Sequence, residues 1–124
     1  MRSRLRFAVV AAVVCGLLAS AGVALASGAK TTVTLKGPDS VYGTIKSPSS
    51  SCLGGRKVVV YMQKGSKQNP KVDQKMDTTT SVREGNKGTW DMGNPGFPQH
   101  KNYYAEAKKS SGCQAGFSKT EKFS

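Results

Sequence analysis

The chain has 124 residues and a formal net charge of +12, with one histidine, seven carboxylates and three cysteines. A chain of this length can hold one small domain, which excludes a multidomain enzyme. One histidine and few carboxylates leave little material for a catalytic site. The excess of basic residues points to an anionic partner or to a need for solubility.

Residues 1–26 have the three parts of a secretory signal peptide. Three arginines precede an almost unbroken apolar run at 7–18, and Ala-Leu-Ala at 24–26 provides the small side chains that a signal peptidase reads. We therefore expect a helical signal peptide at 1–26, Sec-type export of a bacterial protein and cleavage before Ser27. The mature protein would then be secreted and extracellular.

Three alternatives to a cleaved Sec signal fit less well. A retained anchor needs about 20 apolar residues, which 7–26 could just supply, but the small-residue cleavage site argues against it. With such an anchor, the chain would meet a membrane only through the uncleaved signal peptide. A lipoprotein anchor at Cys15 lacks the small residue that should precede it, because Val14 is there. Twin-arginine export lacks an adjacent pair, since Ser3 separates Arg2 from Arg4.

The remaining residues, 27–124, are predicted to form a single domain with a thin apolar core. Removing the signal leaves 98 residues, with 16 basic against 7 acidic side chains and a net charge of +9. Leucine, isoleucine, valine and phenylalanine number only 13 of the 98, a proportion at which disorder is an alternative. Such a domain needs stabilisation beyond apolar burial.

Two cysteines are left after export, and they predict one intramolecular disulfide between Cys52 and Cys113. This bond would close a loop of 61 residues, for which the chain-entropy model gives about 4 kcal/mol. That value approaches the whole net stability of a small domain. Two free thiols or an intermolecular bridge are the alternatives.

Strand-like alternation of polar and apolar residues recurs along the mature chain, and no segment keeps a 3.6-residue period. Gly43 on an apolar face predicts the close approach of a bulky neighbour, and the valine run 58–60 predicts burial on both faces of its strand. Seven short strands are expected, at residues 31–35, 41–45, 56–62, 76–82, 89–92, 102–108 and 113–117. Their number and spacing favour an all-β, antiparallel sandwich.

The connections and the inward faces follow from the same pattern. Residues 65–74 are polar and are interpreted as an exposed loop, and the two glycines of 83–88 fit a hairpin. On the last two strands, the residues expected to point inward are Tyr103, Ala105, Ala107, Cys113, Ala115 and Phe117.

Several residues follow one another in a familiar order: Val41-Tyr42-Gly43-Thr44-Ile45, Cys52, Arg56, Val58, Val60, Thr79, Gly88, Trp90, Tyr103-Tyr104-Ala105 and Cys113. This order, over about residues 31–120, resembles secreted bacterial β-sandwich domains of the carboxypeptidase-regulatory-like or transthyretin-like type. The resemblance implies an immunoglobulin-like or prealbumin-like sandwich with a structural or binding role. It also implies a buried hydrophobe at Trp90, an inward Tyr103 and a Cys52–Cys113 link. The isopeptide bond of some related adhesin modules is not expected, because no Asn or Asp follows Cys113.

No catalytic residue, metal site or cofactor is predicted. His100 lies in a loop shortly after Pro98, and a zinc or copper site would need further ligands. The chain has no HExxH, P-loop or GxSxG motif. A small secreted hydrolase or nuclease using His100 beside Lys101 is the enzymatic alternative, and it lacks a second acid–base group.

Positive charge and aromatic side chains are the remaining functional signals. The lysines proposed to bind polyanions are Lys64, Lys67, Lys71, Lys75, Lys101, Lys108 and Lys109. Outside the cell their partners would be anionic cell-envelope polymers or carbohydrate, and lysine favours diffuse attraction over specific nucleic-acid recognition. Solubility alone is the alternative. We expect Trp90 and Tyr103 in the core, and Phe97 and Tyr104 exposed for stacking on sugars.

The sequence as a whole predicts a secreted, non-catalytic, disulfide-stabilised β-sandwich module with a structural or binding role outside the cell. A polyanion- or carbohydrate-binding module is the more specific alternative.

Overall fold

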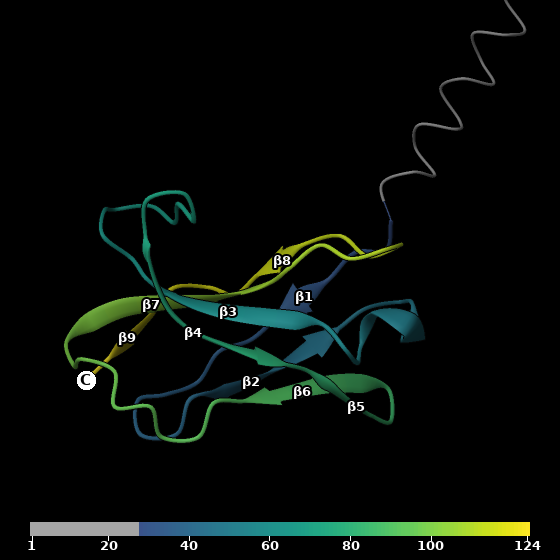
Figure 1. Cartoon of the computed structure of the whole chain (residues 1–124), viewed down its shortest axis with the longest axis horizontal. Coiled ribbons are helices and arrows are strands. Elements are labelled where there is room, and N and C mark those ends of the chain that lie inside the picture. Colours follow the sequence, from purple (N-terminus) through teal and green to yellow (C-terminus); the bar gives the residue numbers. More distant parts are fainter. Residues whose placement is uncertain (1–27) are drawn as a thin grey trace, which may run out of the picture.

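The protein is an antiparallel β-sandwich in a computed structural model that describes residues 28–124 (Figure 1). One sheet has four strands in the order β1-β2-β6-β5, and the other has five, in the order β4-β3-β7-β8 with β9 also beside β7. The predicted signal peptide, 1–26, lies outside the described residues. Among the residues that are described, no helix is long and apolar enough to cross a membrane. The expected all-β sandwich is confirmed.

All pairings between the named strands are antiparallel. The four-stranded sheet consists of β1 (Thr32–Val33), β2 (Tyr42–Lys46), β6 (Lys87–Asp91) and β5 (Val82–Glu84). The five-stranded sheet consists of β4 (Gln74–Thr80), β3 (Lys57–Met62), β7 (Lys101–Ala107), β8 (Gly116–Phe117) and β9 (Glu121–Phe123). A short 3-10 turn, η1 (Ser50–Cys52), follows β2.

Nine strands are found in the described residues instead of the expected seven, because one predicted strand is divided and one strand forms beyond the predicted ones. Ser81 divides the strand predicted at 76–82. Its buried hydroxyl donates to the Leu53 carbonyl at 2.7 Å and accepts from the Arg56 backbone N–H at 3.0 Å. Anchored there, the chain leaves the five-stranded sheet after β4 and enters the four-stranded sheet as β5. The strand predicted at 113–117 is shortened to β8, and β9 forms after it.

The core lies between the two sheets and confirms most of the predicted inward positions. The Trp90 ring of β6 lies against Gly43 of β2, where any Cβ would overlap that ring and the Thr34 carbonyl. Val59 is fully buried although it faces away from the core, as the valine run predicted. Phe97 was wrongly expected at the surface and is half-buried against the core. The main core residues are Val33, Leu35, Val41, Ile45, Val58, Val60, Trp90, Tyr103, Ala105, Ala107 and Phe123.

The predicted phase of the C-terminal strand was wrong. Phe117 is 44% exposed, and Ala115 is only half-buried. Gly116 points inward instead, at a place where a Cβ would collide with neighbouring backbone. The aromatic place in the core is taken by Phe123, whose ring stacks on Tyr103 with centroids 4.4 Å apart. A small residue at 116 therefore decides which alternate positions face the core.

Residues 63–73, which join β3 to β4, form the predicted loop with mostly exposed side chains, but one buried residue fastens the loop to the five-stranded sheet. Asp73 is 8% exposed, and its carboxylate accepts from the backbone N–H groups of Lys64 (3.0 Å) and Asn69 (2.7 Å). It also accepts from the Tyr104 hydroxyl at 2.5 Å. Tyr104 is fully buried as a result, so the expectation that its ring is exposed was wrong.

Candidate functional site

Charge is divided unevenly between the interior and the surface. Two of the seven carboxylates, Asp73 and Glu106, are buried, whereas every lysine is exposed or half-buried. Of the two arginines in residues 28–124, Arg56 is buried and Arg83 is exposed. The surface therefore carries fifteen cationic side chains against five carboxylates. Within the described part of the chain the only ion pair joins Lys108 Nζ to Glu106 Oε1, at 3.6 Å.

The lysines singled out from the sequence lie in separate places. Lys64, Lys67 and Lys71 are on the 63–73 loop, and Lys75 follows on β4. Lys101 begins β7, and Lys108 and Lys109 follow its other end. A strand of that length separates them by about 23 Å. The loop lysines thus form one group, and the β7 lysines are divided between the two ends of the sandwich.

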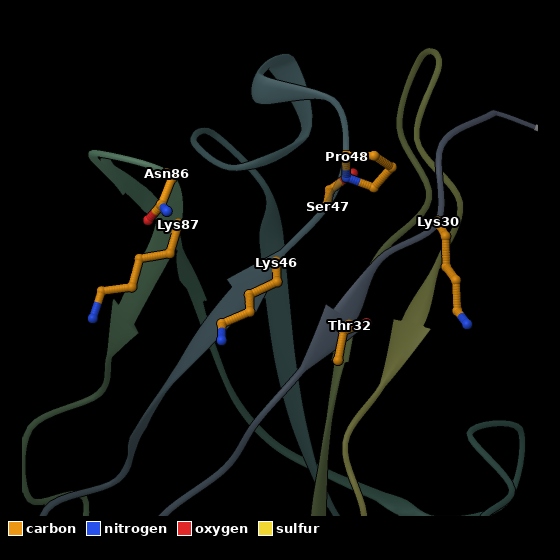
Figure 2. A pocket seen from close by; sticks show the side chains of 7 residues that line it. All are labelled: Lys30, Thr32, Lys46, Ser47, Pro48, Asn86 and Lys87. Carbon is orange, nitrogen blue, oxygen red and sulfur yellow. The ribbon is translucent and has the colours of Figure 1, made fainter.

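Another basic group is created by the fold, and no pattern in the sequence pointed to it. Lys30 precedes β1, Lys46 ends β2, and Lys87 begins β6 after the hairpin turn (Figure 2). Together with Thr32, Ser47, Pro48 and Asn86 they line an open hollow of about 510 Å³. We call it the basic hollow. Figure 2 shows Lys46 and Lys87 pointing the same way from adjacent strands, with Lys30 beyond Thr32.

The register explains how the lysines of the basic hollow meet. Thr32 pairs with Lys46, and Ile45 pairs with Gly88, so the next position places Lys46 directly opposite Lys87. Like charges opposite each other on neighbouring strands destabilise a sheet. An anion between the two ammonium groups would remove that repulsion. The sequence pattern of one strand does not reveal its partner or register, so this group of lysines could not be predicted from the sequence.

A second hollow of about 510 Å³ adjoins the basic hollow on the same sheet face and shares Lys87 with it. Its outward-pointing side chains provide an aromatic ring, hydroxyls, carboxylates and one exposed valine; they are Tyr42, Thr44, Thr80, Val82, Glu84, Thr89 and Asp91. We call it the hydroxyl hollow. Tyr42 is 44% exposed. This sheet therefore presents an exposed aromatic ring at Tyr42, whereas Tyr104 presents none.

Each of the two buried carboxylates accepts a hydrogen bond from a tyrosine hydroxyl of the five-stranded sheet. The Tyr61 hydroxyl donates to Glu106 Oε1 at 3.0 Å, and the Tyr61 and Tyr104 rings stack with centroids 5.2 Å apart. Burial, with the hydrogen bond and the charge of Glu106, raises the pKa of Tyr61 to about 12. Burial, with the hydrogen bond to Asp73, raises the pKa of Tyr104 further. The Tyr104–Asp73 bond holds the 63–73 loop on the sheet, and the Tyr61–Glu106 bond joins β3 to β7.

Opposing causes set the pKa of Asp73. Burial by itself would raise it. Hydrogen bonds from Tyr104, Lys64 and Asn69, together with the positive charge of Lys64, prevail and lower the pKa of Asp73 below its ordinary value. The carboxylate therefore stays ionised, and its role is structural.

The predicted disulfide is confirmed: Cys52 and Cys113 are bonded, with their Cα atoms 5.7 Å apart. Arg56 lies beside it and is 2% exposed. Its guanidinium donates to the carbonyls of Cys52 (3.0 Å), Lys108 (2.9 Å) and Gln114 (2.8 Å), and also to a threonine hydroxyl. Arginine and disulfide together join η1, the end of β7 and the segment before β8.

His100 is exposed in the loop before β7, with a φ of 63°. Residues 28–124 contain no group of three or more His, Cys, Asp or Glu side chains that could hold a metal ion. Comparison of the sequence with protein-family models and with curated proteins gives no match. The resemblance to carboxypeptidase-regulatory-like or transthyretin-like domains thus stays a prediction.

Proposed function

We propose that the chain is a secreted, non-catalytic β-sandwich module that binds anionic polymers outside the cell. The observation that carries the proposal is the partition of charge. Two carboxylates are buried, and fifteen cationic side chains remain at the surface against five carboxylates. A surface of this kind attracts polyanions in a salt-dependent way.

A binding role is also supported by how the acid–base groups are used. Asp73 and Glu106 are each tied to a tyrosine hydroxyl, and the buried arginine is bonded to carbonyls. General acid–base catalysis needs a group held within reach of a substrate proton, and these are held against the protein itself.

Solubility is the competing explanation of the charge, and chromatography separates the two. We expect the mature protein to leave a heparin column at a clearly higher salt concentration than a sulfonated cation exchanger of similar charge density. Attraction by net charge alone gives the same elution from both columns. Equal elution, or release from heparin at low salt, would overturn the proposal.

A further inference from the structure

The outer face of the four-stranded sheet offers one ligand two kinds of contact. The basic hollow carries lysines, the hydroxyl hollow carries an aromatic ring with hydroxyls and carboxylates, and Lys87 lines both. A ligand long enough to cover both hollows would meet positive charge at one end and a sugar-like set of partners at the other. This continuity distinguishes the face from the scattered lysines elsewhere.

The strand register orders these contacts into rows. Alternate residues of a strand point to the same side, so successive rows are about 7 Å apart. The first row contains Thr32, Lys46, Lys87 and Glu84; the second contains Thr34, Thr44, Thr89 and Val82; the third contains Lys36, Tyr42 and Asp91. Cationic, hydroxyl-bearing and aromatic rows therefore follow one another along the strands.

Each row suits a different part of a sugar acid. The exposed Tyr42 ring presents a flat apolar face with a polar tip, which suits the C–H face of a sugar ring. The Thr44 hydroxyl is hydrogen-bonded to Thr34, and the Thr89 hydroxyl donates to the Val82 carbonyl. Both oxygens can still accept from sugar hydroxyls, as can the Asp91 carboxylate. Lys46 and Lys87 supply point charges for a carboxylate, sulfate or phosphate group.

We propose that this face binds an acidic polysaccharide, with a sugar ring on Tyr42 and an acidic substituent between Lys46 and Lys87. Four residues of β2 separate the two contacts, about 13 Å, which a short oligosaccharide covers and a single ring does not. For its anionic half this inference rests on the proposed function. It adds the sugar, the sheet face and the residues.

The neutralisation of two opposed lysines gives the acidic group a defined place. Within the described residues neither Lys46 nor Lys87 has a carboxylate within 4.0 Å, although Glu84 pairs with Lys87 across the hairpin. An acidic substituent would supply the missing counter-charge. A neutral polysaccharide would leave the repulsion in place, and a sugar-free polyanion would leave Tyr42 without a role.

The test compares a polymer with sugar rings and one without. Polygalacturonate and inorganic polyphosphate are titrated by calorimetry into the mature, oxidised protein at low salt. The aromatic contact is tested with Tyr42→Ala, and the matched control is Phe117→Ala, because Phe117 is equally exposed (44%) on the other sheet. A melting curve is recorded for every variant, and only variants that melt like the unsubstituted protein are compared.

The charged contact is tested with a double substitution. Lys46→Gln with Lys87→Gln is compared with Lys101→Gln and Lys122→Gln, which removes the same charge from β7 and β9. Tyr42→Ala is expected to weaken polygalacturonate binding about fivefold and to leave polyphosphate binding unchanged. The Lys46 and Lys87 double variant is expected to weaken polygalacturonate binding about tenfold, well beyond its control.

Failure of this inference differs from failure of the proposed function. If both polymers bind, but Tyr42→Ala has no effect or both double variants lose affinity equally, the attraction is diffuse; the further inference is overturned and the proposed function stands. The same holds if polyphosphate binds more tightly than polygalacturonate. If neither polymer binds at low salt, both proposals are overturned.

Discussion

Arg56→Met tests whether a buried guanidinium, and not the disulfide alone, holds this small domain together. The side chain donates four hydrogen bonds, at 2.8 to 3.1 Å, to three carbonyl oxygens and one hydroxyl. Methionine keeps an unbranched apolar stem and removes all four bonds, at a cost of about 1 kcal/mol each. Among the described residues, the carbonyls of Cys52 and Lys108 then have no donor, whereas the Gln114 carbonyl keeps its bond from the Thr31 hydroxyl. Burial lowers the pKa of Arg56, so relief of the buried charge offsets part of the loss. We expect a net decrease of about 3 kcal/mol in the free energy of unfolding.

The measurement is urea denaturation of the oxidised protein, followed by circular dichroism, with Arg83→Met as the control. Arg83 is exposed and has one hydrogen bond, from Nε to the Gly85 carbonyl at 3.0 Å, so its replacement should change stability by less than about 0.5 kcal/mol. For Arg56→Met, 3 kcal/mol corresponds to roughly 15 °C in melting temperature. A decrease below about 1 kcal/mol would refute the role assigned to the guanidinium.

The same experiment under reducing conditions measures how far Arg56 and the disulfide act on the same segments. Reduction of the unsubstituted protein should cost about 4 kcal/mol. Arg56 bonds the carbonyl of Cys52 and that of Gln114, next to Cys113, so both devices fix the same two segments. The two losses should therefore fall short of additivity by about 1 kcal/mol. Strict additivity would mean that the guanidinium and the disulfide stabilise the fold independently.

Three further predictions concern packing and pH. Gly43→Ala should lower the free energy of unfolding by about 1–3 kcal/mol, because the Cβ would overlap the Trp90 ring and neighbouring backbone. Gly65→Ala is the control, since a Cβ there has no atom within 4 Å and should leave stability unchanged. Equal urea midpoints for the two variants would contradict this prediction. The pKa of Tyr61 rises from 10.0 to about 12 on folding, so its contribution is complete below pH 10 and is lost as the pH rises toward 12; tyrosinate absorbance that titrates like a free tyrosine would refute this. The pKa of Asp73 is lowered from 3.8, so its contribution is present above that pH and is lost as the pH falls below it; Asp73→Asn should make acid unfolding, followed by circular dichroism, less steep than in the unsubstituted protein.

The parts of the fold that were predictable from sequence are those fixed by local alternation or by covalent chemistry. The valine run at 58–60 indicated a strand buried on both faces, and two cysteines allowed a single intramolecular pair. Gly43 indicated a bulky neighbour, which is Trp90. Each of these inferences needs only the residue type and its immediate neighbours in the chain.

The parts that were not predictable depend on contacts distant in sequence. The alternation at 113–117 fits two phases, and the lack of space at Gly116 selects the one that exposes Phe117. The alternation along its strand places Tyr104 on the face that points away from the core, where exposure is expected. In the fold its hydroxyl donates to the Asp73 carboxylate, and the 63–73 loop covers the ring. A polar loop with a single aspartate gives no sign of such a contact before the fold is known.

The candidate site was missed for the same reason. Lys30, Lys46 and Lys87 belong to three segments, and a scan for clustered lysines finds the 63–73 loop instead. Only the register of β2 with β6 makes Lys46 and Lys87 neighbours. Clustering along the sequence therefore located exposed lysines of one loop, whereas pairing across strands brings together the lysines that line a hollow.

Solubility alone does not account for the way lysines are placed on the two outer faces. The five-stranded sheet also sets two lysines opposite each other, Lys57 and Lys108, since Lys108 N–H donates to the Lys57 carbonyl beside the Val58–Ala107 pair. There the Glu106 carboxylate is 3.6 Å from Lys108 and offsets the repulsion. In the described residues no carboxylate lies within 4.0 Å of the ammonium group of Lys46 or Lys87, although Glu84 is opposite Lys87 on β5. A net charge of this size would keep the protein soluble with either lysine replaced. A destabilising arrangement that solubility does not require supports the proposal of an anionic ligand that neutralises it, and it favours the basic hollow over the β7 lysines as the place of that ligand.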